Sequence, residues 1–216
     1  VERVRKAYDE FELHLVYRSL YDFCVNDLSA YYLDMSKDRL YCGGKDSVER
    51  RSAQFAMSEI LLTLVELMAP ILSFTAEDIW KNIMSNEGSV FLLNMPVPDK
   101  KYLDTKLEKK WEKIMTLRGE VYKQIEALRA KKEISASIEA GVEIGLKGRE
   151  WANSLEGLLC MAFIVGQVKL VEGDQIVVKK APGQKCERCW IVKESVGAKQ
   201  NHQTLCERCA AVVEMV

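Results

Sequence analysis

The chain of 216 residues, 48% hydrophobic and 29% charged, is long enough for one large domain or two small ones. Its apolar runs are far shorter than the roughly 20 residues that span a bilayer, and no charged segment followed by an apolar one opens it, so neither a membrane nor a secreted protein is indicated. The net charge of −1 divides into −6 for residues 1–99, +5 for residues 100–149, −3 for residues 150–178 and +3 for residues 179–216, so the basic stretches that a polyanion would seek lie in the C-terminal half.

Three helical segments are predicted in the first half of the chain. Apolar and aromatic side chains recur every three or four residues from residue 2 to about residue 34, which predicts one long helix or a broken pair. Because Val1 falls inside this pattern, we expect the chain to be a fragment of a longer protein. A second long helix should run to Pro70, and a third, short one should include Trp80. The expected capping residues are Asp46 or Ser47 for the second helix and Ser73 or Thr75 for the third.

The second half predicts a long helix and then a small α+β unit. Residues Ser85–Lys101, with one glycine and two prolines, lack a helical period and indicate a surface loop. A long basic helix should follow at Thr105–Lys132, after which the apolar pattern changes to a period of two. Pro182 and Gly183 then form a linker. The elements expected before this linker are a strand with alternating side chains from Ile138 to Leu146, a helix at Glu150–Leu158, and strands at Met161–Val165, Val168–Val171 and Gln175–Lys179.

Four of the seven cysteines form two matched pairs near the C-terminus, Cys186-Glu187-Arg188-Cys189 and Cys206-Glu207-Arg208-Cys209. A two-residue gap lets one tight turn present two thiolates to the same ion, and two such turns complete a tetrahedral zinc site. Four cysteine ligands leave no open position for water or substrate, so we predict one structural zinc ion in a zinc ribbon. Clustered pairs also favour a metal and a reducing cytoplasm over disulfides. The remaining cysteines are expected to be reduced thiols: Cys24, Cys42 and Cys160.

The neighbours of the cysteines suggest how the metal module is used. Trp190 follows the second cysteine and either fills the small core of the ribbon or stacks on an unpaired RNA base. His202 is interpreted as a solvated loop residue rather than a ligand. Four thiolates on Zn²⁺ carry a formal charge of −2. The cations placed to offset this charge are Lys185, Arg188 and Arg208.

Catalytic patterns are missing from the sequence. No nucleophile with its base, no paired carboxylates, no glycine-rich phosphate loop and no zinc-protease motif is present. The residues alone therefore predict a binding module with a structural metal and nucleic acid as its leading partner. The expected fold is mainly α, a helical bundle at residues 1–102, followed by a long helix with a small α+β unit at residues 103–180 and a four-cysteine zinc ribbon at residues 181–216.

Several segments carry a family resemblance. Tyr31–Tyr41, Arg50–Gln54 and Leu67–Trp80 resemble the anticodon-binding helical bundle of class I aminoacyl-tRNA synthetases. The terminal module, opening with Cys-Glu-Arg-Cys-Trp at Cys186–Trp190, is similar to that of the bacterial isoleucyl members, whereas valyl and leucyl relatives lack it. The resemblance covers the whole chain.

The resemblance implies that a parent enzyme joins isoleucine to its tRNA, using ATP with Mg²⁺, while this piece holds the anticodon end of that tRNA. The parent is expected to be a cytoplasmic monomer that binds neither DNA nor a membrane. Its catalytic and editing domains are absent here, so the fragment alone should be inactive. The side chains expected to contact RNA are Trp190, Arg188 and Lys193, with Arg50 and Arg51 as further candidates that could instead pair with Asp38 or Asp46.

Two other functions compete with this interpretation. Some DNA glycosylases end in a similar four-cysteine zinc finger, so a zinc-ribbon DNA repair protein is the main alternative. Such an enzyme needs a catalytic terminal amine or a lysine pocket, and the helical sequence before residue 100 shows no sign of one. A zinc-stabilised scaffold that binds only protein is the second alternative, and it would need exposed apolar patches on its helices.

Overall fold

The computed structural model describes residues 1–83 and 88–215, and these fall into two compact units. Unit 1 comprises Val1–Asp34 and Val48–Leu103, and unit 2 comprises Met35–Ser47 and Asp104–Val216. The predicted division into three domains groups the chain differently and stays a prediction. Among the described residues, no helix combines the length and the apolarity that crossing a membrane requires.

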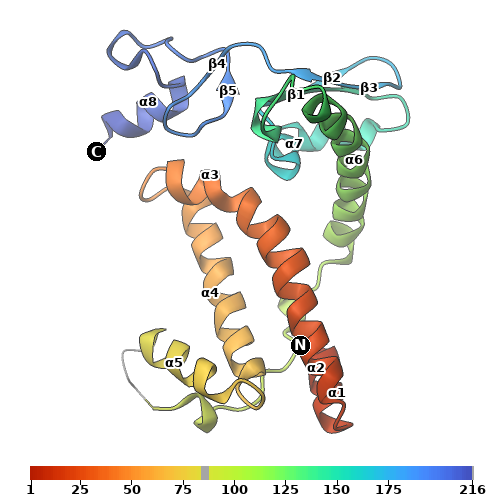
Figure 1. Cartoon of the computed structure of the whole chain (residues 1–216), viewed down its shortest axis with the longest axis vertical. Coiled ribbons are helices and arrows are strands. Elements are labelled where there is room, and N and C mark those ends of the chain that lie inside the picture. Colours follow the sequence, from red (N-terminus) through yellow and green to blue (C-terminus); the bar gives the residue numbers. More distant parts are fainter. Residues whose placement is uncertain (84–87, 216) are drawn as a thin grey trace. The chain divides into compact units, whose positions relative to one another are not determined.

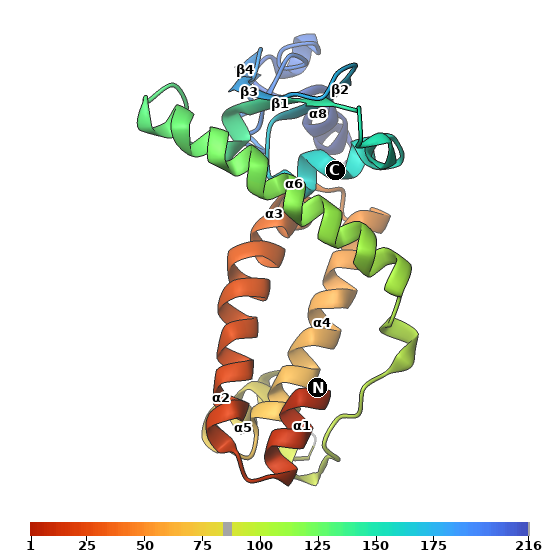
Figure 2. The ribbon, with the colours of Figure 1, turned by 90° about the vertical axis from the view of Figure 1, so that its right-hand side faces the viewer.

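The N-terminal helical segment is broken near its start. Helix α1 (Glu2–Asp9) and helix α2 (Leu13–Asp22) are separated at Phe11, whose φ of 58° is rare for a bulky residue and ends the first helix. Helix α2 continues into a π-helical stretch, η1 (Phe23–Leu33), and then into α3 (Asp34–Cys42). The alternative of a broken helix is therefore the correct one, and Figure 2 shows α1 folded back beside α2.

Two further helices complete unit 1, as the sequence predicts. Helix α4 (Val48–Met68) begins one residue after Ser47, and helix α5 (Ser73–Ile83) begins at one of the expected capping residues. The Tyr8 hydroxyl donates a hydrogen bond of 2.9 Å to the Leu67 carbonyl and so ties α1 to the end of α4. The main core of the unit joins α1, α2 and α4 through the buried side chains of Val4, Ala7, Val16, Leu20, Leu64 and Leu67.

A connecting segment follows α5, and its described part is irregular as expected. It holds two short 3₁₀ turns, η2 (Val90–Leu92) and η3 (Lys100–Tyr102), while residues 85–87 of the predicted loop lie outside the described residues. The Glu77 carboxylate of α5 accepts hydrogen bonds from the Ser89 hydroxyl (2.8 Å) and the Val90 N–H (3.0 Å). The Ser89 hydroxyl, together with the Val90 amide and Lys81, holds the pKa of Glu77 below its usual value.

This arrangement makes the η2 turn sensitive to acid. A carboxylate with a lowered folded-state pKa stabilises the fold fully above the ordinary glutamate pKa of about 4.3, and its contribution is lost as the pH falls through the folded value. We therefore expect Glu77→Gln to weaken the turn at pH 7, and we expect its effect to shrink progressively as the pH falls below about 4.3 and through the lowered folded-state pKa. Hydrogen exchange of the Val90 amide, compared between the two proteins across this pH range, measures the effect. A difference that persists undiminished in acid would contradict this origin.

The larger part of unit 2 is a small α+β fold. Its three-stranded sheet has the order β2-β1-β3, in which β1 (Ala140–Gly145) pairs in parallel with β2 (Gln167–Val171) and antiparallel with β3 (Ile176–Lys180). The Asp104 carboxylate caps helix α6 (Thr105–Ala130) by accepting hydrogen bonds from two backbone N–H groups of its first turn. Helix α6 packs against this sheet (Figure 2). The core is formed mainly by Ile114, Leu117, Val121, Ile125, Val142, Ile144, Leu159, Phe163, Val168 and Val178.

One predicted strand in this unit is wrong. Residues Met161–Val165 were expected to be extended, but helix α7 (Glu156–Phe163) continues through most of them, directly after the 3₁₀ turn η5 (Glu150–Leu155). A short, fully buried apolar run has the same composition in a strand and in a helix, so periodicity does not separate the two. The helix ends at Ile164, which has a left-handed φ of 55°. The mainly α fold with a small α+β unit and a C-terminal cysteine module is confirmed.

Candidate metal centre

The four clustered cysteines lie together at the end of unit 2. Their sulfur atoms are all within 4.8 Å of one another, and three of the four side chains are completely buried. Cys186 and Cys189 come from the turn between the short strands β4 (Gln184–Lys185) and β5 (Val192–Lys193). Cys206 and Cys209 lie at the start of helix α8 (Glu207–Glu214). Residues 17 to 23 positions apart in the chain thus converge on one point.

Backbone geometry at the first cysteine pair explains why the turn closes. The Trp190 N–H donates to the Cys186 carbonyl (2.8 Å), and the Cys186 N–H donates to the Ile191 carbonyl (3.1 Å). This tight turn requires a left-handed φ of 63° at Trp190 itself. Gly183 precedes the hairpin with a φ of 102°, and a Cβ atom there would lie only 2.3 Å from the Lys193 carbonyl oxygen. Glycine is therefore required at the entrance to the turn.

The thiols fit a zinc ion in number, chemistry and spacing. Zinc bound by four thiolates at about 2.3 Å implies sulfur atoms about 3.8 Å apart, because this is the edge of the tetrahedron. The Cys189 and Cys206 sulfur atoms are 3.9 Å apart. The Cys206 N–H also donates to the Cys186 sulfur at 3.3 Å, as backbone amides do when they stabilise a thiolate. These four cysteines would hold the ion, and its role would be to stabilise the fold.

The electrostatics of the cluster divide the thiols into two kinds. Burial acts to raise the pKa of the Cys186 thiol. Hydrogen bonds from the backbone N–H groups of Cys189, Cys206 and Arg188 together outweigh this effect and lower the pKa to about 6. Burial raises the pKa of Cys189 and of Cys209, and neighbouring thiols add to this effect. The Cys186 thiol is therefore ready to lose its proton at neutral pH, whereas Cys189 and Cys209 need a nearby cation to do so.

Two arginines of the module attach it to the end of α3, within the same unit. Arg188 donates through Nη1 to the Cys42 carbonyl oxygen (2.6 Å), and the same atom lies 3.8 Å from the Cys209 sulfur. Arg208 forms a two-pronged ion pair with the Asp38 carboxylate, in which both N–O distances are 2.5 Å. Arg188 thus approaches a thiolate as predicted, while Asp38 pairs with Arg208 rather than with Arg50 or Arg51.

The predicted RNA-contacting residues are distributed over both units. Trp190 is 63% exposed, so its indole lies outside the ribbon core, and the Lys185 amine lies 5.9 Å from the centre of its ring. Lys193 is half-buried on β5. Arg50 and Arg51 lie in the first turn of α4 in unit 1, where Arg51 donates to Gln54. Among these residues, Arg188 lies 3.8 Å from the Cys209 sulfur, Trp190 follows the first cysteine pair, and Lys193 lies on the strand after that turn.

His202 does not belong to the cluster. Among the described residues, the metal-binding group consists of the four cysteines alone, and the His202 Nε2 atom lies 3.7 Å from the Glu214 carboxylate. That His202 does not bind the metal stays a prediction.

Comparison with known proteins shows the family of the chain. Residues 1–144 match the family described as the anticodon-binding domain of tRNA ligases. The chain belongs to this family. Residues 183–212 match a second family, described as the zinc finger found in FPG and IleRS. The matched residues include all four clustered cysteines. The match over the bundle favours the tRNA interpretation over the DNA repair alternative, which the zinc finger by itself would allow.

Several bacterial relatives are similar along almost the whole chain. Isoleucine–tRNA ligase of Caldicellulosiruptor saccharolyticus is 42% identical over 100% of this chain and 24% of the relative. The ligase of the same name from Brevibacillus brevis is 42% identical over 99% of this chain and 25% of the relative, and that of Geobacter sulfurreducens is 40% identical over 99% and 25%. The chain spans about a quarter of the length of these relatives.

The sequence does not predict the residues that accept hydrogen bonds from Arg188 and Arg208. Cys42 was interpreted only as a reduced thiol, yet its carbonyl oxygen accepts a hydrogen bond from Arg188 and its own thiol donates to the Arg188 carbonyl at 3.5 Å. Asp38 and Arg208 are 170 positions apart. No local pattern marks such a pair, but the position of Arg208 inside a cysteine pair could have indicated a need for an acidic partner.

Proposed function

We propose that this chain is the anticodon-recognising part of an isoleucine–tRNA ligase and that it holds one structural zinc ion through Cys186, Cys189, Cys206 and Cys209. The parent would attach isoleucine to its tRNA with ATP and Mg²⁺, as a cytoplasmic monomer that binds neither DNA nor a membrane. The family of residues 1–144 and the names of the similar proteins support the tRNA as partner. The piece itself would bind tRNA without catalysing the reaction.

The observation that carries this proposal is the exposed indole on the metal-binding turn. Recognition of single-stranded RNA uses aromatic side chains on which splayed bases stack. Trp190 follows the turn that carries Cys186 and Cys189 and is tied to it by a hydrogen bond to the Cys186 carbonyl, and the residue as a whole is 63% exposed. The neighbouring cations Lys185 and Lys193 would attract the RNA backbone, and Arg188 would contribute where its remaining N–H groups are accessible. Arg50 and Arg51 are proposed as additional phosphate contacts from unit 1.

A binding comparison tests the proposed partner. The zinc-loaded 216-residue chain is titrated with an isoleucine tRNA transcript, with a tRNA of another amino acid, and with duplex DNA of equal charge, all at the same salt concentration. We expect the isoleucine tRNA to bind most tightly and the affinity to fall steeply between about 50 and 200 mM salt, since phosphate contacts release counterions. Equal affinity for tRNA and duplex DNA would support the repair-protein alternative and overturn the proposal.

Substitution of the indole tests its role. Because stacking of one base on an aromatic side chain contributes about 1–3 kcal/mol, Trp190→Ala should weaken binding of isoleucine tRNA by roughly 5- to 150-fold. Trp190→Phe should restore part of the loss. Zinc content should stay at one ion per chain in both variants, because the indole lies outside the cysteine core. Loss of zinc from Trp190→Ala would show instead that the residue acts through the fold of the turn.

A further inference from the structure

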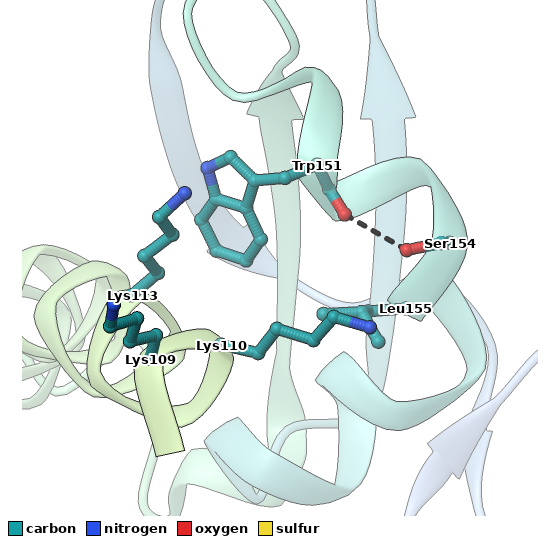
Figure 3. A pocket seen from close by; sticks show the side chains of 6 residues that line it. All are labelled: Lys109, Lys110, Lys113, Trp151, Ser154 and Leu155. Atoms are coloured by element: carbon teal, nitrogen blue, oxygen red, sulfur yellow. Dashed lines mark hydrogen bonds between the residues drawn. The ribbon is translucent and has the colours of Figure 1, made fainter. Parts of the chain in front are cut away.

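A second basic site lies in unit 2, on the α+β fold rather than on the zinc module. Figure 3 shows three lysine side chains from the first half of α6 opposite the η5 turn, with the Lys113 amine beside the Trp151 indole and the Lys110 side chain reaching toward Leu155. These groups line a hollow of about 190 Å³ that is open to solvent. Its wall is completed by Ser154 and Leu155, so that cations, an aromatic face and a hydroxyl group line the same space.

The lysines occupy one face of the helix. At about 100° per residue, Lys106, Lys109, Lys110 and Lys113 fall within an arc of about 100°, and the acidic residues Glu108 and Glu112 fall outside it. All four lysines are exposed. In the part of the chain that the structure describes, no carboxylate forms an ion pair with the amines of Lys109, Lys110 or Lys113. The face thus carries positive charge that no acidic side chain of the described residues neutralises.

The wall opposite the lysines is fixed by the core. Trp151 and Leu155 are half-buried and pack against the main hydrophobic cluster of the unit. The Ser154 hydroxyl donates to the Trp151 carbonyl at 3.1 Å, which holds the turn together. The Lys113 amine lies 5.9 Å from the centre of the Trp151 ring. Because the ring is held by packing while the lysine stems are free to move, a ligand can enter between them without unfolding the site.

We propose that this pocket, formed by Lys109, Lys110, Lys113 and Trp151, is a second tRNA contact, which binds backbone phosphates through the three amines and a nucleoside face on the indole. The inference rests on the proposed function. Successive turns of the helix place lysines about 5.4 Å apart along its axis, which suits a chain of phosphates better than a single anion. An aromatic face beside the cations suits a nucleotide polymer, in which charge and flat bases alternate.

Neutralisation of the three lysines tests the site. The variant Lys109→Gln, Lys110→Gln, Lys113→Gln is compared with a matched control, Lys123→Gln, Lys131→Gln, Lys147→Gln, which removes the same charge from exposed lysines elsewhere in the unit. All six side chains are exposed, so both variants should fold. We expect the pocket variant to bind isoleucine tRNA at least about tenfold more weakly than the parent chain at 150 mM salt. The slope of log affinity against log salt concentration should be smaller by about 2 for this variant. The control variant should change neither quantity much. Equal effects of the two variants would mean general charge attraction and would overturn the inference.

Replacement of the indole gives a second measurement. Trp151→Leu keeps an apolar side chain against the core but removes the stacking face, and thermal unfolding shows whether it folds as the parent does. We expect about fivefold or greater weakening of tRNA binding, as for loss of one stacked base. Unchanged binding by a folded Trp151→Leu variant would remove the indole from the proposed site.

The two proposals fail in different ways. If the unmodified chain binds duplex DNA as well as tRNA, the proposed function fails, whatever the lysine variants do. If the chain prefers isoleucine tRNA and Trp190→Ala weakens it, but the pocket variant binds like its control, only the second site fails. Hydroxyl-radical footprinting of the bound tRNA adds a direct reading, because the pocket variant should lose protection over a short run of nucleotides that Trp190→Ala leaves protected.

Discussion

Removal of zinc is expected to unfold the C-terminal module and leave the rest of the chain folded. The buried cluster of the module consists of Cys186, Cys206 and Cys209, with only Cys189, Val196 and Leu205 packed against it. So few apolar groups cannot offset the conformational entropy that is lost when the residues of the module become ordered. Zinc binding contributes on the order of 10–16 kcal/mol in isolated zinc fingers, and this is the energy that the module lacks without the metal.

Hydrogen exchange with and without a chelator measures this effect. Amides of the module, from Gln184 to Glu214, should lose protection, while those of strands β1–β3 should keep it, because their core lies between the sheet and helices α6 and α7. Cys206→Ser should reproduce the change, whereas Cys24→Ser, at a cysteine of unit 1, should not. Affinity for isoleucine tRNA should fall at least as far as in Trp190→Ala, because the indole depends on the turn. Protection that survives complete removal of the metal would falsify a structural role for zinc.

The metal site could be predicted from the sequence because its information is local. Each cysteine pair fixes one turn, and two turns with the same internal residues leave few other interpretations. The exposed position of Trp190 could not be predicted, because it depends on a left-handed backbone at that residue. The helices of unit 1 were found from their period, while the break at Phe11 was left open, since no glycine or proline marks it.

The features that could not be predicted depend on contacts between residues far apart in the chain, or on segments whose composition suits a strand and a helix equally well. Met161–Val165 was assigned to a strand because a buried apolar run carries no period. The attachment of the module to the end of α3 joins residues 146 and 170 positions apart. The lysines of α6 were visible as a basic stretch, but only the fold places Trp151 opposite them. Contacts between residues far apart in the chain, rather than chemically complex groups, are therefore the features that the sequence does not predict.

Replacement of Arg188 by alanine is expected to lower zinc affinity by about 10- to 100-fold, as is usual for residues that support metal ligands. The guanidinium lies 3.8 Å from the Cys209 sulfur, where it would offset the charge of a zinc-bound thiolate, and it also donates to the Cys42 carbonyl oxygen. The substitution removes both interactions and leaves a half-buried acceptor without its donor, which costs about 1–3 kcal/mol. Competition with a chelator of known affinity measures the first effect, and hydrogen exchange in Met35–Ser47 measures the second.

Arg208→Ala provides the matched control, because it removes an arginine of the same module whose partner is a carboxylate instead of a thiolate. The Arg208 and Asp38 side chains are 41% and 32% exposed, so solvent screens their ion pair and its loss should cost only about 0–1 kcal/mol. Zinc affinity should therefore fall much more in Arg188→Ala than in Arg208→Ala. If Arg188→Ala instead retains zinc and loses only affinity for isoleucine tRNA, the guanidinium acts on RNA directly. Because metal affinity and tRNA affinity are measured separately, the two roles proposed for Arg188 are distinguishable in one variant.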